Sequence, residues 1–196
     1  MKIISVETFT NEYVGLVRLR TDEGDEGWGQ TSTYNSEITA QVVHLQVAPH
    51  VLGMSAIEIK DINREVLERE HKFPGPYLYR ALCGIDTALW DIKAKRAKKS
   101  VCQLLGGNPR SIPVYASSMQ REITPEGEAE RFLKLKEEDG YSAFKFRIGS
   151  ECGHDIDQWA GRTEAIIKEV RKTLGDEVSL LVDANSAFSP KKAIEV

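Results

Sequence analysis

Leu-Leu-Val-Asp-Ala-Asn, residues 180–185, is the stretch of sequence that decides the fold. The continuous apolar run over residues 179–182 is typical of a β-strand that is covered on both faces, as strands are in parallel sheets. The run then passes directly into the polar residues Asp183 and Asn185. In parallel α/β folds, ligands bind at the carboxyl ends of the strands. This stretch therefore predicts both a parallel sheet and a functional position at its edge.

The same arrangement occurs one unit earlier in the chain. Residues 143–148 predict a strand that contains Lys145 and Arg147 near its end. Residues two apart share a face of a strand, so these two cations are expected to point the same way. Between the two strands, residues 159–174 have the apolar spacing of an amphipathic helix. A strand, a helix and a strand at this spacing predict parallel βα units, with Lys145 and Arg147 beside Asp183.

The rest of the second half of the chain repeats this pattern. A strand is predicted at 112–117, a helix begins at Thr124-Pro125 and ends at Gly140, and Ser189-Pro190 begins another helix. Three such units can neither close a barrel nor cover both faces of a sheet. We therefore expect the chain, in its natural form, to continue into further βα units.

The first half of the chain has a different organisation. Residues 14–20 and 26–31 predict an antiparallel hairpin, and Gly24, Gly27 and Gly29 are interpreted as turn and bulge residues. Helices are predicted over residues 36–52, 55–70 and 78–98.

A break in pattern separates the two halves. The sequence Gly-Gly-Asn-Pro at 106–109 ends the last of these helices, and the βα rhythm begins after it. We therefore predict an α+β domain over residues 1–110 and the first βα units of a second domain over residues 111–196.

The composition excludes several classes of function. The chain has 196 residues, and its net charge of −4 gives no basic surface for nucleic acid or anionic lipid. No apolar stretch approaches the length that spans a bilayer, and the amino terminus lacks the features of a signal peptide. Three widely spaced cysteines, Cys83, Cys102 and Cys152, argue against a disulfide framework. These features predict a cytoplasmic protein that binds neither nucleic acid nor membrane.

Residues 81–106 carry the most specific motif, ALCGIDTALWDIKAKRAKKSVCQLLG. With its acids Asp86 and Asp91 and its closing Leu-Leu-Gly, it closely resembles the signature of the mandelate racemase/muconate lactonizing enzyme group of the enolase superfamily. The resemblance implies an α/β fold in which an α+β capping domain precedes a TIM-type (β/α) barrel. The barrel would be truncated here after three βα units, because a full member would be roughly twice as long. The small residues of the motif favour close packing, so we interpret the motif itself as structural.

The same resemblance gives roles to the polar residues at the strand ends. A carboxylate at a strand end suits Mg²⁺, which prefers oxygen ligands, and the resemblance makes Asp183 a metal ligand rather than a loop cap. Asn185 either contacts this site or only forms a turn. In relatives the second cation of the earlier strand is a lysine that acts as a base. Arg147 stands there in this chain and stays protonated, so we expect it to bind a carboxylate and leave base chemistry to Lys145 or to strands outside this chain.

The capping domain offers candidate substrate contacts. The segments 21–33 and 72–79 correspond to loops that close over the substrate in relatives. Four aromatic residues lie in these segments or directly after them: Trp28, Tyr34, Phe73 and Tyr77. Simple packing is the alternative for each of them. The sequence Cys-Gly-His-Asp at 152–155 has no second Cys/His pair to support zinc, and we interpret it as a loop.

These residues together predict a Mg²⁺-dependent enzyme that abstracts the proton α to a carboxylate and forms an enediolate. The substrate would be a small carboxylic acid, and the enzyme a homo-oligomer. Dehydration of a sugar acid is favoured, because a racemase needs a base on each face of the substrate and Arg147 removes one candidate. The alternatives are a racemase or epimerase, a cycloisomerase, and a catalytically inactive relative.

Overall fold

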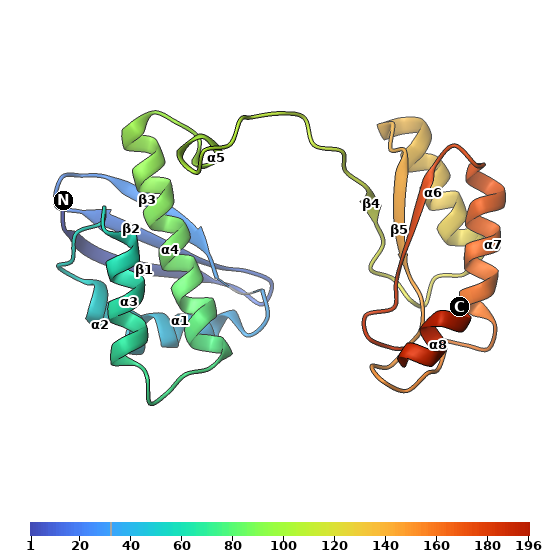
Figure 1. The fold of residues 1–196 in the computed structure, drawn as a ribbon, viewed down its shortest axis with the longest axis horizontal. Coiled ribbons are helices and arrows are strands. Elements are labelled where there is room, and N and C mark those ends of the chain that lie inside the picture. The colour runs from blue at the N-terminus through green and yellow to red at the C-terminus, as the bar shows by residue number, and fades with distance from the viewer. Residues whose placement is uncertain (32) are drawn as a thin grey trace. The chain divides into compact units, whose positions relative to one another are not determined.

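The computed structural model describes residues 1–31 and 33–196, and Figure 1 shows its elements. The chain divides into two compact units, Met1–Arg110 and Ser111–Val196. The first unit contains β1 (Ile3–Thr10), β2 (Gly15–Thr21), β3 (Glu26–Gln30), α1 (Ser36–Val42), the π-helical turn η1 (Val43–Val47), α2 (Ala48–Val51), α3 (Ile59–Arg69), α4 (Pro76–Ala97) and α5 (Val101–Leu104). None of the helices in the described ranges is both long enough and apolar enough to cross a bilayer.

The sheet of the first unit is an antiparallel meander in the order β1-β2-β3. Side chains alternate across β2, so that Val17 and Leu19 are fully buried while Arg18 points to the other face. The buried face packs on the long helix α4, whose Ile85 and Leu89 are also fully buried. One hydrophobic core therefore joins the sheet to α4.

Glycines allow β3 to approach α4 closely. A Cβ atom at Gly29 would lie 2.0 Å from the carbonyl oxygen of Gly84, and one at Gly27 would lie 2.1 Å from that of Ala88. The interpretation of Gly27 and Gly29 as bulge residues is wrong, because β2 and β3 pair without a shift in register. Close packing of the small residues in the motif is confirmed, and it places a strand rather than another helix against α4.

The acid Asp91 of the motif hydrogen-bonds to the backbone of the edge strand β3. Its Oδ2 accepts a hydrogen bond of 2.9 Å from the backbone N–H of Trp28, and Lys95 Nζ donates to the same oxygen at 2.6 Å. Lys95 also donates to the carbonyl oxygen of Glu26 at 3.1 Å. An edge strand leaves backbone groups unpaired, and these contacts satisfy two of them.

The helix predicted over residues 36–52 is interrupted. It consists of α1, η1 and α2 in succession. Pro49 has no amide hydrogen to donate to the carbonyl one turn earlier, and the wider turn η1 precedes it. The following helix, α3, begins at Ile59 rather than at residue 55.

The second unit contains parallel βα units. Its elements are β4 (Ala116–Ser117), α6 (Pro125–Asp139), β5 (Ala143–Arg147), α7 (Arg162–Leu174), β6 (Ser179–Asp183) and α8 (Pro190–Glu195). The strands pair in parallel in the order β4-β5-β6. In Figure 1, α6 and α7 lie together on one face of this sheet. Phe144 and Phe146 of β5 are fully buried in the same core as Phe132 of α6 and Ile166 of α7.

Sequence-predicted caps of this unit are confirmed. Thr124 Oγ1 accepts a hydrogen bond of 3.1 Å from the N–H of Gly127, and Ser189 Oγ accepts one of 3.3 Å from Lys192. Gly140 follows α6 in the left-handed conformation, with φ of 73°.

One strand of this unit is shorter than the sequence predicts. Only Ala116 and Ser117 of the strand predicted at 112–117 pair with β5. Ala116 pairs with Phe144 and β5 begins at Ala143, so residues 112–114 lie opposite residues that precede the strand. The coverage of 179–182 on both faces stays a prediction, because three βα units cannot cover both faces of the described sheet. β6 is its edge strand, and Leu181 and Val182 are 38% and 49% exposed.

Candidate active site at the ends of β5 and β6

Lys145, Arg147 and Asp183 meet at the carboxyl ends of two neighbouring strands. Arg147 pairs in register with Asp183, the last residue of β6. Because side chains alternate, Phe144 and Phe146 face the helices while Lys145 and Arg147 face the opposite side of the sheet. Lys145 Nζ lies 2.6 Å from Asp183 Oδ2, and Arg147 Nε lies 3.7 Å from the same oxygen. The structure therefore brings the three predicted residues into one cluster.

The carboxylate of Asp183 is held in its ionised form. The hydrogen bond from Lys145 is the largest cause of a lowered pKa, and burial opposes it. The backbone N–H of Asn185 donates to Oδ1 at 2.9 Å and also lowers the pKa. Hydrogen bonds to the charged form favour it, so this side chain is an anion at neutral pH.

The cluster has an excess of positive charge. Two cations face one carboxylate, and the side chains of Lys145 and Arg147 are only 20% and 12% exposed. Arg147 Nε is buried without a hydrogen-bond partner among the described residues, and Nη2 has only the weak acceptor Met119 Sδ at 3.5 Å. A buried cationic donor without an acceptor is costly. The arrangement is therefore suited to an additional anion beside Arg147.

Asn185 forms the turn that follows β6. Its φ is 46° and that of Ser186 is 62°, both in the left-handed region that asparagine tolerates better than most residues. Its side chain is exposed, and its backbone N–H is the part that contacts Asp183. The structure thus shows the turn and leaves a contact from the amide side chain as a proposal.

The environment of Asp183 fits one ligand of a magnesium ion. A carboxylate has about four lone-pair sites, and Lys145 and Asn185 use two of them here. The residues that the structure describes contain no group of three His, Cys, Asp or Glu side chains that could hold a metal. Mg²⁺ is commonly bound by one or two carboxylates together with water and substrate oxygens. Asp183 could therefore supply one oxygen, with the other ligands coming from water, substrate or carboxylates outside this chain.

Trp28 lies within the sheet of the first unit. Its ring centroid is 5.3 Å from that of Phe9, and the guanidinium carbon of Arg18 is 5.3 Å from the Trp28 ring. Its Nε1 donates to Glu26 Oε1 at 2.8 Å. The ring therefore belongs to an aromatic and charged cluster on the outer face of the sheet.

The other three aromatic candidates lie around the start of α4. Asn35 Nδ2 donates to Tyr77 Oη at 2.8 Å, which joins the segment before α1 to the first turn of α4. Tyr34 and Phe73 are 73% and 69% exposed. Tyr34, Phe73 and Tyr77 thus come from neighbouring segments, whereas Trp28 is held on a sheet face. Residue 32 of the predicted loop 21–33 lies outside the described residues.

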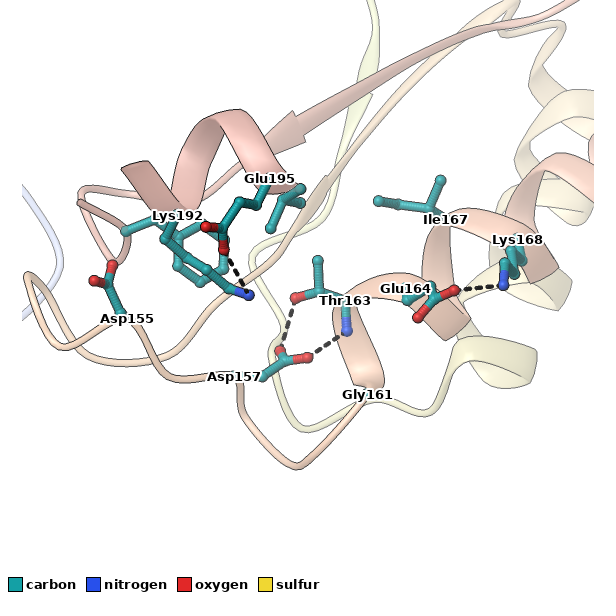
Figure 2. A pocket seen from close by; sticks show the side chains of 11 residues that line it. Asp155, Asp157, Gly161, Thr163, Glu164, Ile167, Lys168, Lys192 and Glu195 are labelled. Carbon is teal, nitrogen blue, oxygen red and sulfur yellow. Dashed lines mark hydrogen bonds and ion pairs between the residues drawn. The ribbon is translucent and has the colours of Figure 1, made fainter. Parts of the chain in front are cut away.

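A cavity of the second unit is separate from this cluster. It has a volume of about 600 Å³ and lies among α7, α8 and the loop before α7, as Figure 2 shows. Charged groups along it are paired locally: Lys168 with Glu164 at 2.5 Å, and Lys192 with Glu195 at 3.8 Å. Its lining does not include the three clustered residues.

The sequence Cys-Gly-His-Asp at 152–155 lies in a loop, as predicted. Gly153 N–H donates to the carbonyl oxygen of Ser186 at 2.7 Å, and Asp155 accepts from the N–H of Ser189. The loop is thereby fastened to the turn after β6.

One residue near the site has no signal in the sequence. Arg162, the first residue of α7, is fully buried, and its Nη1 donates to the carbonyl oxygen of Arg147 at 2.9 Å. An arginine in the first turn of an amphipathic helix is usually a surface residue. Its contact depends on the tertiary fold and could not be read from local pattern.

Comparison with known proteins identifies the family. Residues 2–106 match the family described as "Mandelate racemase / muconate lactonizing enzyme, N-terminal domain", and residues 128–196 match "Enolase C-terminal domain-like". The chain belongs to the mandelate racemase/muconate lactonizing enzyme group of the enolase superfamily. The predicted fold class, an α+β capping domain followed by the first units of a barrel, is confirmed with it.

Three relatives illustrate the similarity. A crystal structure from Roseobacter denitrificans, of a protein provisionally called a racemase, is 53% identical with a TM-score of 0.94 and matches 100% of this chain and 53% of its own. The crystal structure of a mandelate racemase/muconate lactonizing protein from Paracoccus denitrificans, complexed with magnesium, is 26% identical with a TM-score of 0.87. The match covers 99% of this chain and 54% of that chain. A D-galactonate dehydratase family member from Catenulispora acidiphila is 30% identical over 91% of this chain and 47% of that protein. The chain spans about half the length of each.

Proposed function

We propose that this chain forms part of an enzyme that removes the proton α to the carboxylate of a sugar acid and then eliminates a β-hydroxyl as water. The observation that carries the proposal is the excess of cationic groups on one face of the strand ends. Arg147 Nε is buried there without a hydrogen-bond partner among the described residues, with Asp183 Oδ2 at 3.7 Å. The carboxylate of such a substrate would supply the missing anion. Family membership and the dehydratase name of one relative support this substrate class.

In this proposal Arg147 binds a substrate carboxylate oxygen. Guanidinium stays protonated at any physiological pH, so its part is electrostatic rather than proton transfer. The α-proton is weakly acidic, and its removal increases the negative charge on the carboxylate oxygens. Cations that are already in position beside these oxygens stabilise that charge. Lys145, on the same face, is the candidate base in this chain.

Asp183 is the proposed metal ligand in this chain. Mg²⁺ bound there would supply a further positive charge beside the substrate carboxylate. In the described geometry Lys145 Nζ lies 2.6 Å from Asp183 Oδ2. Its ammonium form has no lone pair, so Lys145 must leave this oxygen and lose a proton before its nitrogen can act as the base. The exposure of the Asp183 side chain, 26%, leaves the carboxylate reachable from solvent.

Racemisation is the second candidate, because the 53% identical relative is provisionally called a racemase. A racemase requires a proton acceptor on each face of the α-carbon. Lys145 would serve one face, and the second acceptor would have to lie outside this chain because Arg147 cannot take that role.

Exchange of the substrate α-proton in D₂O tests the proposal in the complete natural protein. Sugar acids are incubated with enzyme and Mg²⁺, and deuterium at the α-carbon and release of a 2-keto acid are followed by NMR. We expect Lys145→Met to abolish exchange and Arg147→Lys to retain more activity than Arg147→Met. Deuterium incorporation with inversion of configuration at the α-carbon, and without release of a 2-keto acid, would favour racemisation. Normal exchange by Lys145→Met together with none by Arg147→Lys would overturn the division of roles.

A further inference from the structure

The last carbonyl of β5 has no strand to pair with on one side. The N–H of Ser118 donates to the carbonyl oxygen of Lys145 at 2.8 Å and is the last contact on the β4 side. Two residues later the carbonyl of Arg147 points to the same edge, because backbone groups alternate along a strand. Arg162 Nη1 donates to this oxygen at 2.9 Å. A guanidinium group thus takes the place of the next backbone amide.

Arg162 also holds the chain that leaves β4. Its Nε donates to the carbonyl oxygen of Ile123 at 3.2 Å. Its guanidinium carbon lies 5.2 Å from the centroid of the Trp159 ring, within the range of a cation–π contact. One side chain therefore joins the end of β5 to the segment that follows β4.

This arrangement buries a charge at a cost. The side chain is fully buried, and desolvation is the largest cause of a lowered pKa of Arg162. Coulombic attraction from Asp157, Glu128 and Glu122 opposes this lowering of the pKa of Arg162. Asp157 also accepts a hydrogen bond from Thr163, and Glu128 pairs with Arg131 at 2.8 Å. Nη2 of Arg162 has no hydrogen-bond partner among the described residues. The hydrogen-bond acceptors of Arg162 among the described residues are neutral carbonyl oxygens, so burial of this cation is not explained by stability alone.

We propose that Arg162 is a positioning residue that fixes the carbonyl of Arg147 and thereby aims the side chains of Lys145 and Arg147 at Asp183. The proposal rests on the function proposed above and assigns a further residue to it. The hydrogen bond to the carbonyl oxygen of Arg147 restricts rotation of the backbone at Arg147, and with it the direction of the Arg147 side chain. A misplacement of about 1 Å at a reacting centre can cost about 100-fold in rate.

Arg171 provides a matched control on the same helix. Its Nη1 donates to the carbonyl oxygens of Gly175 at 2.8 Å and Val178 at 3.0 Å, at the opposite end of α7. Arg162→Met and Arg171→Met each remove one guanidinium that binds two carbonyl groups. Comparing the two variants separates loss of backbone anchoring in general from loss at the active end of the sheet.

The test measures kcat, KM and thermal stability for both variants and for Arg162→Lys in the complete natural protein. We expect Arg162→Met to lower kcat by about 100-fold, and Arg171→Met to change it by less than about threefold. Arg162→Lys should recover about tenfold of the loss, since an ammonium can still donate to one carbonyl. A fall in kcat for Arg162→Met no larger than that for Arg171→Met, at equal loss of stability, would overturn the proposal. If Arg162→Met does not fold, Arg162→Lys and Arg162→Gln are compared with Arg171→Met in the same way.

Amide exchange tests positioning without activity. The N–H of Ile148 donates to the carbonyl oxygen of Asp183 at 3.1 Å, directly after Arg147. Its hydrogen exchange should quicken in Arg162→Met and stay unchanged in Arg171→Met. A wild-type protein that exchanges no α-proton, but shows this difference, would refute the proposed function and retain the positioning role. Equal protection of Ile148 in both variants would refute the positioning role alone.

Discussion

At the scale of single residues, Asp183 has the most testable role. Asp183→Asn removes the negative charge but keeps the size of the side chain. Removing a residue that hydrogen-bonds to a metal ligand typically lowers metal affinity by about 10- to 100-fold. Removing the charge of the ligand itself should therefore reduce Mg²⁺ affinity by at least about tenfold. Isothermal titration calorimetry of the complete protein measures this. Asp176→Asn, an exposed acid in the loop before β6, is the control and should bind Mg²⁺ normally. Unchanged affinity in Asp183→Asn would exclude the residue as a ligand.

Sequence patterns predicted the site only in part. Alternation along β5 and the abrupt end of the apolar run at Asp183 were enough to place Lys145 and Arg147 beside this acid. The direct contact of Lys145 with Asp183 Oδ2 depends on the register between β5 and β6, which no local pattern fixes. Arg162 was missed for a related reason, since its contacts with the carbonyl oxygens of Ile123 and Arg147 depend on the tertiary fold.

At the scale of elements, the contact of β3 with α4 should be intolerant of added volume. Gly29→Ala places a Cβ atom where the backbone of Gly84 lies, and neither backbone can yield easily. Overpacking of this kind costs about 1–3 kcal/mol in the free energy of unfolding. Urea denaturation measures the loss. Gly75→Ala is the matched control, because nothing lies within 4 Å of its Cβ position and its φ of 167° is extended. Equal stability of the two variants would contradict the packing described.

The outer face of the first sheet should make stability depend on pH. The hydrogen bond from Arg18 is the largest cause of a lowered pKa of Glu7, whose ordinary value is 4.5. A carboxylate with a lowered pKa in the folded state contributes stability above its unfolded pKa. This contribution is lost as the pH falls through the folded pKa. Arg18→Met should therefore be less stable than the wild type at about pH 7, and the difference should shrink toward about pH 3.

Thermal unfolding across this range measures that difference. The contacts of Arg18 with the Phe9 and Trp28 rings do not change with pH. The part of the destabilisation that comes from losing them should therefore be the same at both pH values. Arg64→Met is the control, because this arginine of α3 is 63% exposed and its ion pairs are of the kind that contribute little. A destabilisation of Arg18→Met that is equal at both pH values would argue against the Glu7 contribution.

At the scale of the whole molecule, the open edge of the second sheet is expected to govern association. β6 ends the described sheet, and Val182 is 49% exposed on it. Exposed apolar edge strands are templates for pairing with other chains, and a lysine there prevents it. Val182→Lys should therefore reduce self-association of the 196-residue chain in light scattering. Leu45→Lys changes a leucine that is 75% exposed on a helical turn and should have no such effect. Equal scattering from the two variants would place the association elsewhere.

The π-helical turn η1 has a consequence for chain length. Buried residues before, within and after it follow a spacing of four: Thr39, Val43, Val47 and Val51, all fully buried. In a regular α-helix a spacing of four drifts by about 40° per step, so such a row would wind off the core within three steps. A π-turn holds more residues than an α-turn and cancels part of this drift. Deleting one residue from 43–47 would change the spacings in this row to four, three and four. Eleven residues at about 100° each would then bring Val51 to within about 20° of Thr39 on a regular α-helix. Relatives that share this fold are therefore expected to have either this π-turn or a regular α-helix that is one residue shorter in this segment.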